Sequence, residues 1–136
     1  MDLVIDANIL FAILIKEGIT EKIMFSDNIH LYAPEYLFTE FQKHEKEILE
    51  ITQRSQTDFS RLIGVLERRI DLVPFSKFCD FFEEAKTLLD DKNDAAYLAV
   101  CIAKQMPLWS NDRGFKKQNR VEIFTTEDII RKLDLA

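Results

Sequence analysis

The stretch Leu3-Val4-Ile5-Asp6-Ala7-Asn8 joins two apolar segments near the start of this 136-residue chain. Residues 3–5 form a short continuous apolar run of the kind found in buried strands, and the longer run from Ile9 to Lys16 is compatible with a helix. Asp6 therefore follows directly on a predicted strand, at the turn into a predicted helix. This order of strand, acidic turn and helix is typical of an α/β fold.

The same alternation continues along the chain. Predicted strands cover residues 3–5, 30–33, 71–73, 108–110 and 121–124, and predicted helices cover residues 9–16, 34–53, 57–69, 77–89, 94–104 and 126–133. Pro34 is expected at the first position of its helix, where its missing N–H costs nothing. Five strands alternating with helices predict an α/β fold, a three-layer α/β/α sandwich around a mainly parallel, about five-stranded sheet.

Composition sets the class of protein. With 47% hydrophobic and 31% charged residues, the chain is too apolar to be disordered, and we expect one domain over residues 1–136. Gly and Pro number only three each, which disfavours an all-β sandwich with a turn after every strand. The longest apolar run, Ile9 to Ile15, is far shorter than the roughly 20 residues that span a bilayer. The acidic start also differs from a secretion signal. We expect a cytoplasmic protein with no membrane association.

Charge and cysteine content exclude several kinds of site. The net charge of −6 argues against a nucleic-acid binder that relies on a broad basic face. Cys79 and Cys101 have no zinc-type spacing, and His30 and His44 lie in unrelated segments. We expect Cys101, inside an apolar run, to be a buried and inert thiol. An anionic substrate would need divalent cations held by clustered carboxylates.

Candidate carboxylates follow the predicted strands. Open parallel sheets bind ligands outside the carboxyl ends of their strands. Asp6 follows the first strand and Asp112 follows the fourth, while Asp94 begins the helix that precedes the fourth strand. Glu40 lies at the edge of the apolar face in the helix after the second strand. We expect these four carboxylates to converge at one rim, where oxygen ligands favour Mg²⁺ or Mn²⁺.

Each acid also has a purely structural interpretation. Asp91 and Asp94 suit the start of a helix, whose positive end attracts acids. Asp6 could cap the helix after it, and Glu40 could pair with a base one turn later, Lys43 or His44. Asp112 could belong to a plain strand exit, followed by four cations on a solvated face: Arg113, Lys116, Lys117 and Arg120.

The order of four motifs favours the functional interpretation, because together they resemble the PIN domain family. The motifs are Val4 to Leu10 with Asp6, Leu37 to Phe41 with Glu40, Asn93 to Ala99 with Asp94, and Leu108 to Asp112. In that family, acids at these places form a metal-binding nuclease centre, so the resemblance implies this role for Asp6, Glu40, Asp94 and Asp112. It spans nearly the whole chain, from Leu3 to about Phe124. Ser110 stands where many relatives carry Thr, and Ala7 stands where many carry Thr or Ser. No acid of the family pattern is missing.

The chemistry of each side chain indicates its role in such a metal centre. We expect Asp6, Asp94 and Asp112 to bind the ion directly, and Glu40 to act through water, hold a second ion or accept a proton from the nucleophile. Hydrogen bonds that fix the ligands are expected from Asn8 and Ser110. Contacts to flanking phosphates are expected from the cations after the last acid, Arg113, Lys116 and Lys117.

The resulting hypothesis is a Mg²⁺- or Mn²⁺-dependent endoribonuclease that cuts single-stranded or locally unpaired RNA. The preference for RNA comes from the family resemblance. The resemblance also makes an antitoxin protein a candidate partner, because many PIN proteins of this size are toxins of toxin–antitoxin pairs. We expect a homodimer, since PIN relatives often dimerise and the chain is rich in Phe and Ile.

Two other functions are compatible with such a fold. One is a catalytically silent PIN-fold scaffold or regulatory domain that binds another protein, which the intact acids disfavour. The other is a phosphatase or phosphoacceptor domain with Asp6 as nucleophile. It ranks last, because Asp6 and Asn8 lack the second acid of the haloacid dehalogenase-type motif.

Overall fold

A single parallel sheet organises the chain. The computed structural model describes residues 1–15 and 18–134. The sheet has the order β3-β2-β1-β4-β5, and every neighbouring pair of strands is parallel. Its strands are β1 (Asp2–Ile5), β2 (His30–Pro34), β3 (Ile70–Val73), β4 (Leu108–Trp109) and β5 (Ile123–Phe124). The predicted α/β/α fold class is confirmed.

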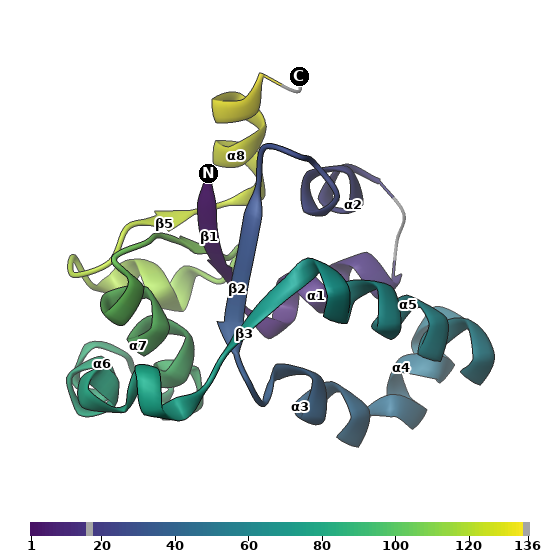
Figure 1. The fold of residues 1–136 in the computed structure, drawn as a ribbon, viewed down its shortest axis with the longest axis horizontal. Coiled ribbons are helices and arrows are strands. Elements are labelled where there is room, and N and C mark those ends of the chain that lie inside the picture. Colours follow the sequence, from purple (N-terminus) through teal and green to yellow (C-terminus); the bar gives the residue numbers. More distant parts are fainter. Residues whose placement is uncertain (16–17, 135–136) are drawn as a thin grey trace.

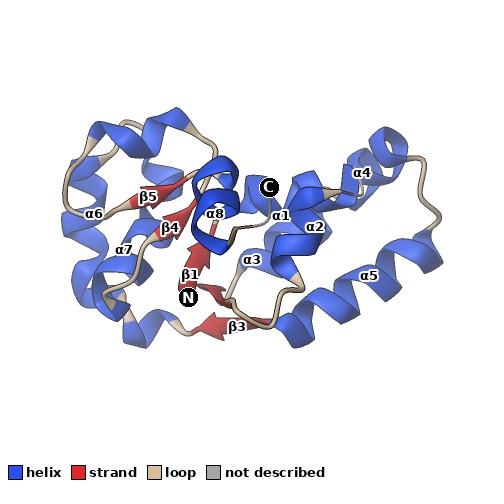
Figure 2. Cartoon of the chain, turned by 90° about the horizontal axis from the view of Figure 1, so that it is seen from above, coloured by secondary structure: helices blue, strands red, loops and turns tan. Residues whose placement is uncertain are grey.

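Helices cover both faces of this sheet. They are α1 (Ala7–Ile15), α2 (Ile19–Met24), α3 (Leu37–Lys43), α4 (Glu45–Thr52), α5 (Gln56–Arg69), α6 (Phe82–Leu88), α7 (Ala95–Lys104) and α8 (Thr126–Leu133). Figure 1 shows α6 and α7 on one side of the sheet and α1 to α5 on the other. The view from above shows the same three layers, with the strands between the two groups of helices (Figure 2). This arrangement leaves the carboxyl ends of β1 and β2 between α7 and α3.

Burial explains why the central elements are so apolar. Residues 3–5 of β1 have no exposed surface, and residues 95–102 of α7 are all buried. A strand covered on both faces needs a continuous apolar run, which is what residues 3–5 provide. Cys101 is buried as predicted, and burial raises the pKa of its thiol. In the part of the chain that the structure describes, every helix is too short or too polar to cross a bilayer.

The predicted helix over residues 34–53 is wrong in two respects. Pro34 is the last residue of β2, paired with Val73 of β3, so the helical segment begins later, at Leu37. A proline is tolerated at a strand end, where its missing N–H interrupts no further ladder bond. The segment then divides at His44, whose backbone leaves the helical region with φ −104° and ψ 16°. This break separates α3 from α4.

The predicted helix over residues 77–89 is also wrong at its start. Two 3₁₀ turns, η1 (Phe75–Lys77) and η2 (Cys79–Phe81), precede α6. Phe78 lies between the two turns, with φ −128° and ψ 0°, and is fully buried. The ring of Phe75 packs edge-on against Phe78, with 5.3 Å between centroids, and against Phe82, at 5.9 Å.

Other boundaries differ by smaller amounts. Helix α2, a six-residue helix, was not predicted, and the fifth strand covers residues 123–124 rather than 121–124. The helix expected from Asp94 is preceded by the 3₁₀ turn η3 (Lys92–Asp94), so α7 begins one residue later. The first helix begins at Ala7, before the expected Ile9, and its expected end at Lys16 lies outside the described residues.

Candidate active site

The order of the strands places a ligand crevice beside Asp6. From β1 the chain runs outward to β2 and β3, then returns to the other side of β1 for β4 and β5. The gap between β1 and β4 is thus the switch point of the sheet, where open α/β folds bind ligands. Asp6 follows β1 and Asp112 follows β4, so two of the four expected carboxylates flank this gap.

Ser110 connects these two acids. Asp6 is 3% exposed, and its Oδ2 accepts a hydrogen bond of 2.5 Å from the Ser110 Oγ, while its Oδ1 accepts one of 3.0 Å from the N–H of Ile9. The Ser110 Oγ in turn accepts the N–H of Asp112 at 3.0 Å. Asp6 therefore does cap α1, and Ser110 also holds it from the side of β4.

Asp112 begins a tight turn. Its Oδ1 accepts the N–H of Gly114 at 2.9 Å, at the start of the 3₁₀ turn η4 (Arg113–Lys117). A Cβ on Gly114 would lie 3.2 Å from that same Oδ1, which is closer than most real contacts. Glycine at this position lets the backbone approach the carboxylate of Asp112, and the hydrogen bond from its N–H fixes the orientation of that carboxylate.

Asp94 does not serve as a helix cap. Its side chain accepts no capping hydrogen bond from α7, whereas Asp91 accepts the N–H of Asn93 at 2.9 Å and so caps η3. Burial, followed by the charges of Asp91, Asp112 and Asp6, raises the pKa of Asp94 to about 6. The carboxylate of Asp94 is therefore available to a ligand and lies in the electric field of the two acids at the switch point.

Asp6 experiences a comparable environment. Burial is the main cause that raises its pKa, and the charge of Asp112 adds to it, while the hydrogen bonds from Ser110 and the backbone act in the opposite direction. Carboxylates that are buried and repel one another are stabilised by a cation between them.

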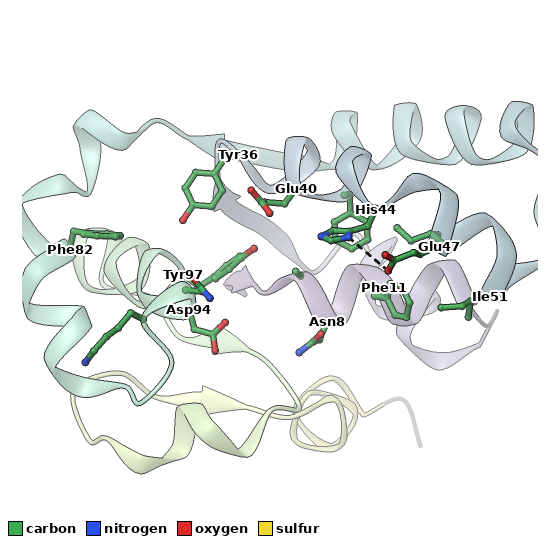
Figure 3. A pocket seen from close by; sticks show the side chains of 15 residues that line it. Asn8, Phe11, Tyr36, Glu40, His44, Glu47, Ile51, Phe82, Asp94 and Tyr97 are labelled. Atoms are coloured by element: carbon green, nitrogen blue, oxygen red, sulfur yellow. Dashed lines mark ion pairs between the residues drawn. The ribbon is translucent and has the colours of Figure 1, made fainter.

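Glu40 lies across the cleft from Asp94 (Figure 3), and its charge does not contribute to the pKa of Asp6 or Asp94. Its side chain is 47% exposed, and its Oε1 accepts a hydrogen bond of 3.2 Å from Lys43, the structural pairing considered above. Figure 3 shows Tyr97 between Asp94 and the pair of Glu40 and Tyr36. Across residues 1–15 and 18–134, no three His, Cys, Asp or Glu side chains lie close enough to hold one ion. The expected carboxylates thus border one region without meeting at a single point.

A cleft of about 640 Å³ runs along this region (Figure 3). Glu40, Asp94, Tyr36 and Tyr97 line one end, and Asn8 lies on its wall. The other end is more apolar, with the side chains of Phe11, Phe41 and Ile51. It also includes His44 and Glu47, whose Nδ1 and Oε2 atoms lie 3.9 Å apart. Asp6 and Asp112 do not line this cleft.

Comparison with known proteins identifies the family. A family profile described as "PIN domain" matches residues 4–134. The chain belongs to the PIN domain family. Comparison of this PIN domain with curated proteins finds no significant match.

A solved structure shares the fold. It is described as the crystal structure of VapBC2 from Rickettsia felis bound to a DNA fragment from their promoter, and one of its chains superposes on this PIN domain with a TM-score of 0.68. The two chains are 18% identical, and the match covers 92% of this chain and 98% of the other. At this identity the similarity establishes the fold.

The cations expected to contact phosphate lie outside the cleft. All three belong to η4, and Lys117 forms an ion pair of 2.7 Å with Asp90, whose pKa the Lys117 hydrogen bond lowers. Arg113 and Lys116 are exposed. The basic residues that line the cleft are His44 and Lys92. Lys92 donates to the carbonyl oxygens of Leu89, at 3.0 Å, and Lys86.

Sequence reasoning assigned no role to Tyr97, Tyr36 or Lys92, although all three line the cleft of this PIN domain. A signal for Tyr97 was present, because it follows Asp94 by three positions and residues at that spacing share one side of a helix. Tyr36 and Lys92 stand in loops and turns, where spacing gives no such signal.

The donor set suits a hard divalent cation. Asp6, Asp94 and Asp112 offer only carboxylate oxygens, the ligands that Mg²⁺ and Mn²⁺ prefer. Burial and mutual repulsion raise the pKa values of Asp6 and Asp94, which is an unfavourable arrangement that a bound dication would relieve. The chemistry of these three carboxylates therefore fits such an ion, while their positions in the described residues do not bring all three around one point.

Proposed function

We propose that this PIN domain is a Mg²⁺- or Mn²⁺-dependent endoribonuclease that hydrolyses phosphodiester bonds in single-stranded or locally unpaired RNA. The observation that carries this proposal is the linked pair of Asp6 and Asp112 at the switch point of the sheet, with Asp94 in the field of both. Membership of a family of nucleases supports it further.

Three carboxylates would hold the ion, namely Asp6, Asp94 and Asp112. A bound Mg²⁺ or Mn²⁺ supplies two effects, a lower pKa of a water molecule and neutralisation of charge on the scissile phosphate. Ser110 orients the Asp6 carboxylate through its hydroxyl, and the N–H of Ile9 holds the other oxygen of Asp6. These two contacts keep Asp6 in place before substrate binds.

Glu40 would act from the opposite side of the cleft. Its longer, exposed side chain can bind an ion through water, hold a second ion or accept a proton from the attacking water. Asn8, which lies on the cleft wall, would hydrogen-bond a ligand there. Arg113, Lys116 and Lys117 would contact phosphates that extend beyond the cleft, with Lys117 first leaving Asp90.

Cleavage of labelled single-stranded RNA tests the proposal directly. We expect cleavage with Mg²⁺ or Mn²⁺, and none with EDTA or in the Asp6→Asn protein. Asp27→Asn is the matched control, because Asp27 is an exposed acid just before β2. It therefore lies at the amino ends of the strands, whereas Asp6 lies at their carboxyl ends. Equal cleavage in EDTA, or by Asp6→Asn and wild type, would contradict the proposal. A parallel assay with single-stranded DNA tests the preference for RNA.

We further propose that the domain acts as a toxin with an antitoxin protein as partner. The similarity in fold to a chain of the VapBC2 structure supports this proposal. Induced expression in a bacterial host should arrest growth, and Asp6→Asn should remove the arrest. Arrest that persists in Asp6→Asn would contradict a toxic nuclease activity.

We also propose that two copies of this PIN domain form a homodimer. Ile15, Ile19 and Phe25 are between 37% and 46% exposed, which leaves apolar surface for a second copy to cover. Sedimentation equilibrium at micromolar concentration should give about twice the chain mass of 16.0 kDa. A mass near that of one chain throughout the concentration range would exclude the homodimer.

A further inference from the structure

Tyr97 combines a buried ring with an accessible hydroxyl. The residue is only 5% exposed, and it packs within the first turn of α7. No hydrogen bond from the described residues contributes to the pKa of its hydroxyl. Yet every fully buried side-chain oxygen or nitrogen among the described residues has a partner. The unpaired hydroxyl must therefore be the part of Tyr97 that is open to the cleft it lines.

The surroundings of this hydroxyl contain acceptors. Figure 3 shows it between Asp94 on one side and Tyr36 with Glu40 on the other. Burial, followed by Tyr36 and the charges of Asp6, Asp94 and Glu40, raises the pKa of Tyr97 above its ordinary value. Its hydroxyl thus keeps its proton throughout the physiological pH range and can donate a hydrogen bond.

A phosphodiester entering this acidic end needs a neutral or positive donor. Lys92 and His44 are the basic side chains that line the cleft. The ammonium group of Lys92 is engaged by the carbonyl oxygens of Leu89 and Lys86, and the Nδ1 of His44 lies 3.9 Å from the Oε2 of Glu47. Tyr97 differs because its ring is fixed by burial and its donor is unused. A fixed donor loses little conformational entropy when it binds a ligand.

We propose that Tyr97 is a substrate-binding residue whose hydroxyl donates a hydrogen bond to a phosphate oxygen of the RNA beside the Asp94 carboxylate. This inference rests on the proposed nuclease function, and it adds a residue to which no role was assigned. Tyr36, whose ring lines the same end of the cleft, is placed to support it from the side of Glu40.

The variant Tyr97→Phe removes one hydroxyl and retains the buried ring. A hydrogen bond to a charged acceptor is worth at least about tenfold in binding, so we expect kcat/KM for single-stranded RNA to fall by at least about tenfold, mainly through KM. Tyr32→Phe is the matched control, since Tyr32 lies on β2 with the Lys104 Nζ 5.6 Å from its ring centroid. Its kcat/KM should stay within about twofold of wild type.

Melting curves distinguish a substrate contact from a structural role. Tyr97→Phe should keep both the melting temperature of wild type and its increase with Mg²⁺. A kcat/KM within twofold of wild type would overturn the inference, as would a loss of activity that comes with loss of the Mg²⁺ effect. If wild-type protein cuts no RNA, the proposed function fails and the inference falls with it. If wild type cuts RNA and Tyr97→Phe cuts it equally well, only the inference fails.

Discussion

The two sides of the acidic region are built differently. At the ends of β1 and β4, Asp6 is buried and receives hydrogen bonds from Ser110 and the backbone, and Ser110 also binds the N–H of Asp112. On α3, Glu40 is half exposed and has one surface ion pair, with Lys43. Both sides were expected to supply ligands, but only the first is fixed by its neighbours.

This difference indicates a division of work. A carboxylate held from two directions loses little freedom on binding an ion, whereas an exposed glutamate loses more. The edge at β1 and β4 is suited to position an ion, and Glu40 is suited to a contact made through water or by movement during the reaction.

The largest expected effect is on activity. Asp6→Asn should lower the rate of RNA cleavage by at least about 100-fold, because it removes the most constrained ligand charge. Glu40→Gln should lower it by roughly 10-fold, in keeping with a general-base or water-mediated role. Single-turnover cleavage of one labelled RNA, with Asp27→Asn as control, measures both variants. A larger loss in Glu40→Gln than in Asp6→Asn would reverse the proposed division.

A second prediction concerns stability. Ser110→Ala leaves the buried Asp6 Oδ2 and the Asp112 N–H without their shared partner, which should lower the free energy of unfolding by about 1–3 kcal/mol. Lys43→Ala, which removes the exposed pair of Glu40, should change it by less than about 1 kcal/mol. Urea unfolding of the metal-free proteins measures both changes. Equal small effects would show that the Ser110 network is no better fixed than the surface pair.

A third prediction concerns pH. The pKa of Asp94 is about 6 in the folded chain, above its ordinary value of 3.8, so the folded state binds this proton more tightly than the unfolded state. Its contribution to stability is present below pH 3.8 and is lost as the pH rises through 6. Relative to wild type, metal-free Asp94→Asn should therefore become more stable as the pH rises from 4 to 7.

The same shift affects metal binding. Protonation of Asp94 competes with the ion, so the increase in melting temperature caused by Mg²⁺ should be smaller at pH 5 than at pH 7.5. Thermal unfolding at the two pH values, with and without Mg²⁺, checks this. An increase that is the same at both values would place the ion away from Asp94.

Much of the fold could be predicted from the sequence because its central elements are strongly patterned. Residues 3–5 and the helix ending at Lys104 are buried almost throughout, and burial on all sides leaves a continuous apolar signal. The break at His44 could not be predicted, because it contains neither Gly nor Pro. The 3₁₀ turns before α6 could not be predicted either, since the edge-on packing of Phe75 against Phe82 joins residues from separate turns.

The candidate site was predictable in part for a similar reason. Asp6 and Asp112 follow strands, and parallel strands bring their carboxyl ends to one edge, so their proximity follows from the topology. Glu40 and the cations of η4 depend on the directions of helices and turns, which the spacing of residues does not encode. Lys117 illustrates this, because its pairing with Asp90 joins segments 27 residues apart.

The most direct test of the central claim is to locate the ion. Crystals of the wild-type protein soaked with Mn²⁺ should show an anomalous difference peak bounded by carboxylate oxygens of Asp6, Asp94 and Asp112, at metal–oxygen distances of about 2.1 Å. Glu40 should reach that ion through water or bind a second one. The same peak should be absent from Asp6→Asn crystals. A Mn²⁺ ion bound elsewhere, with these three acids unchanged, would contradict the account.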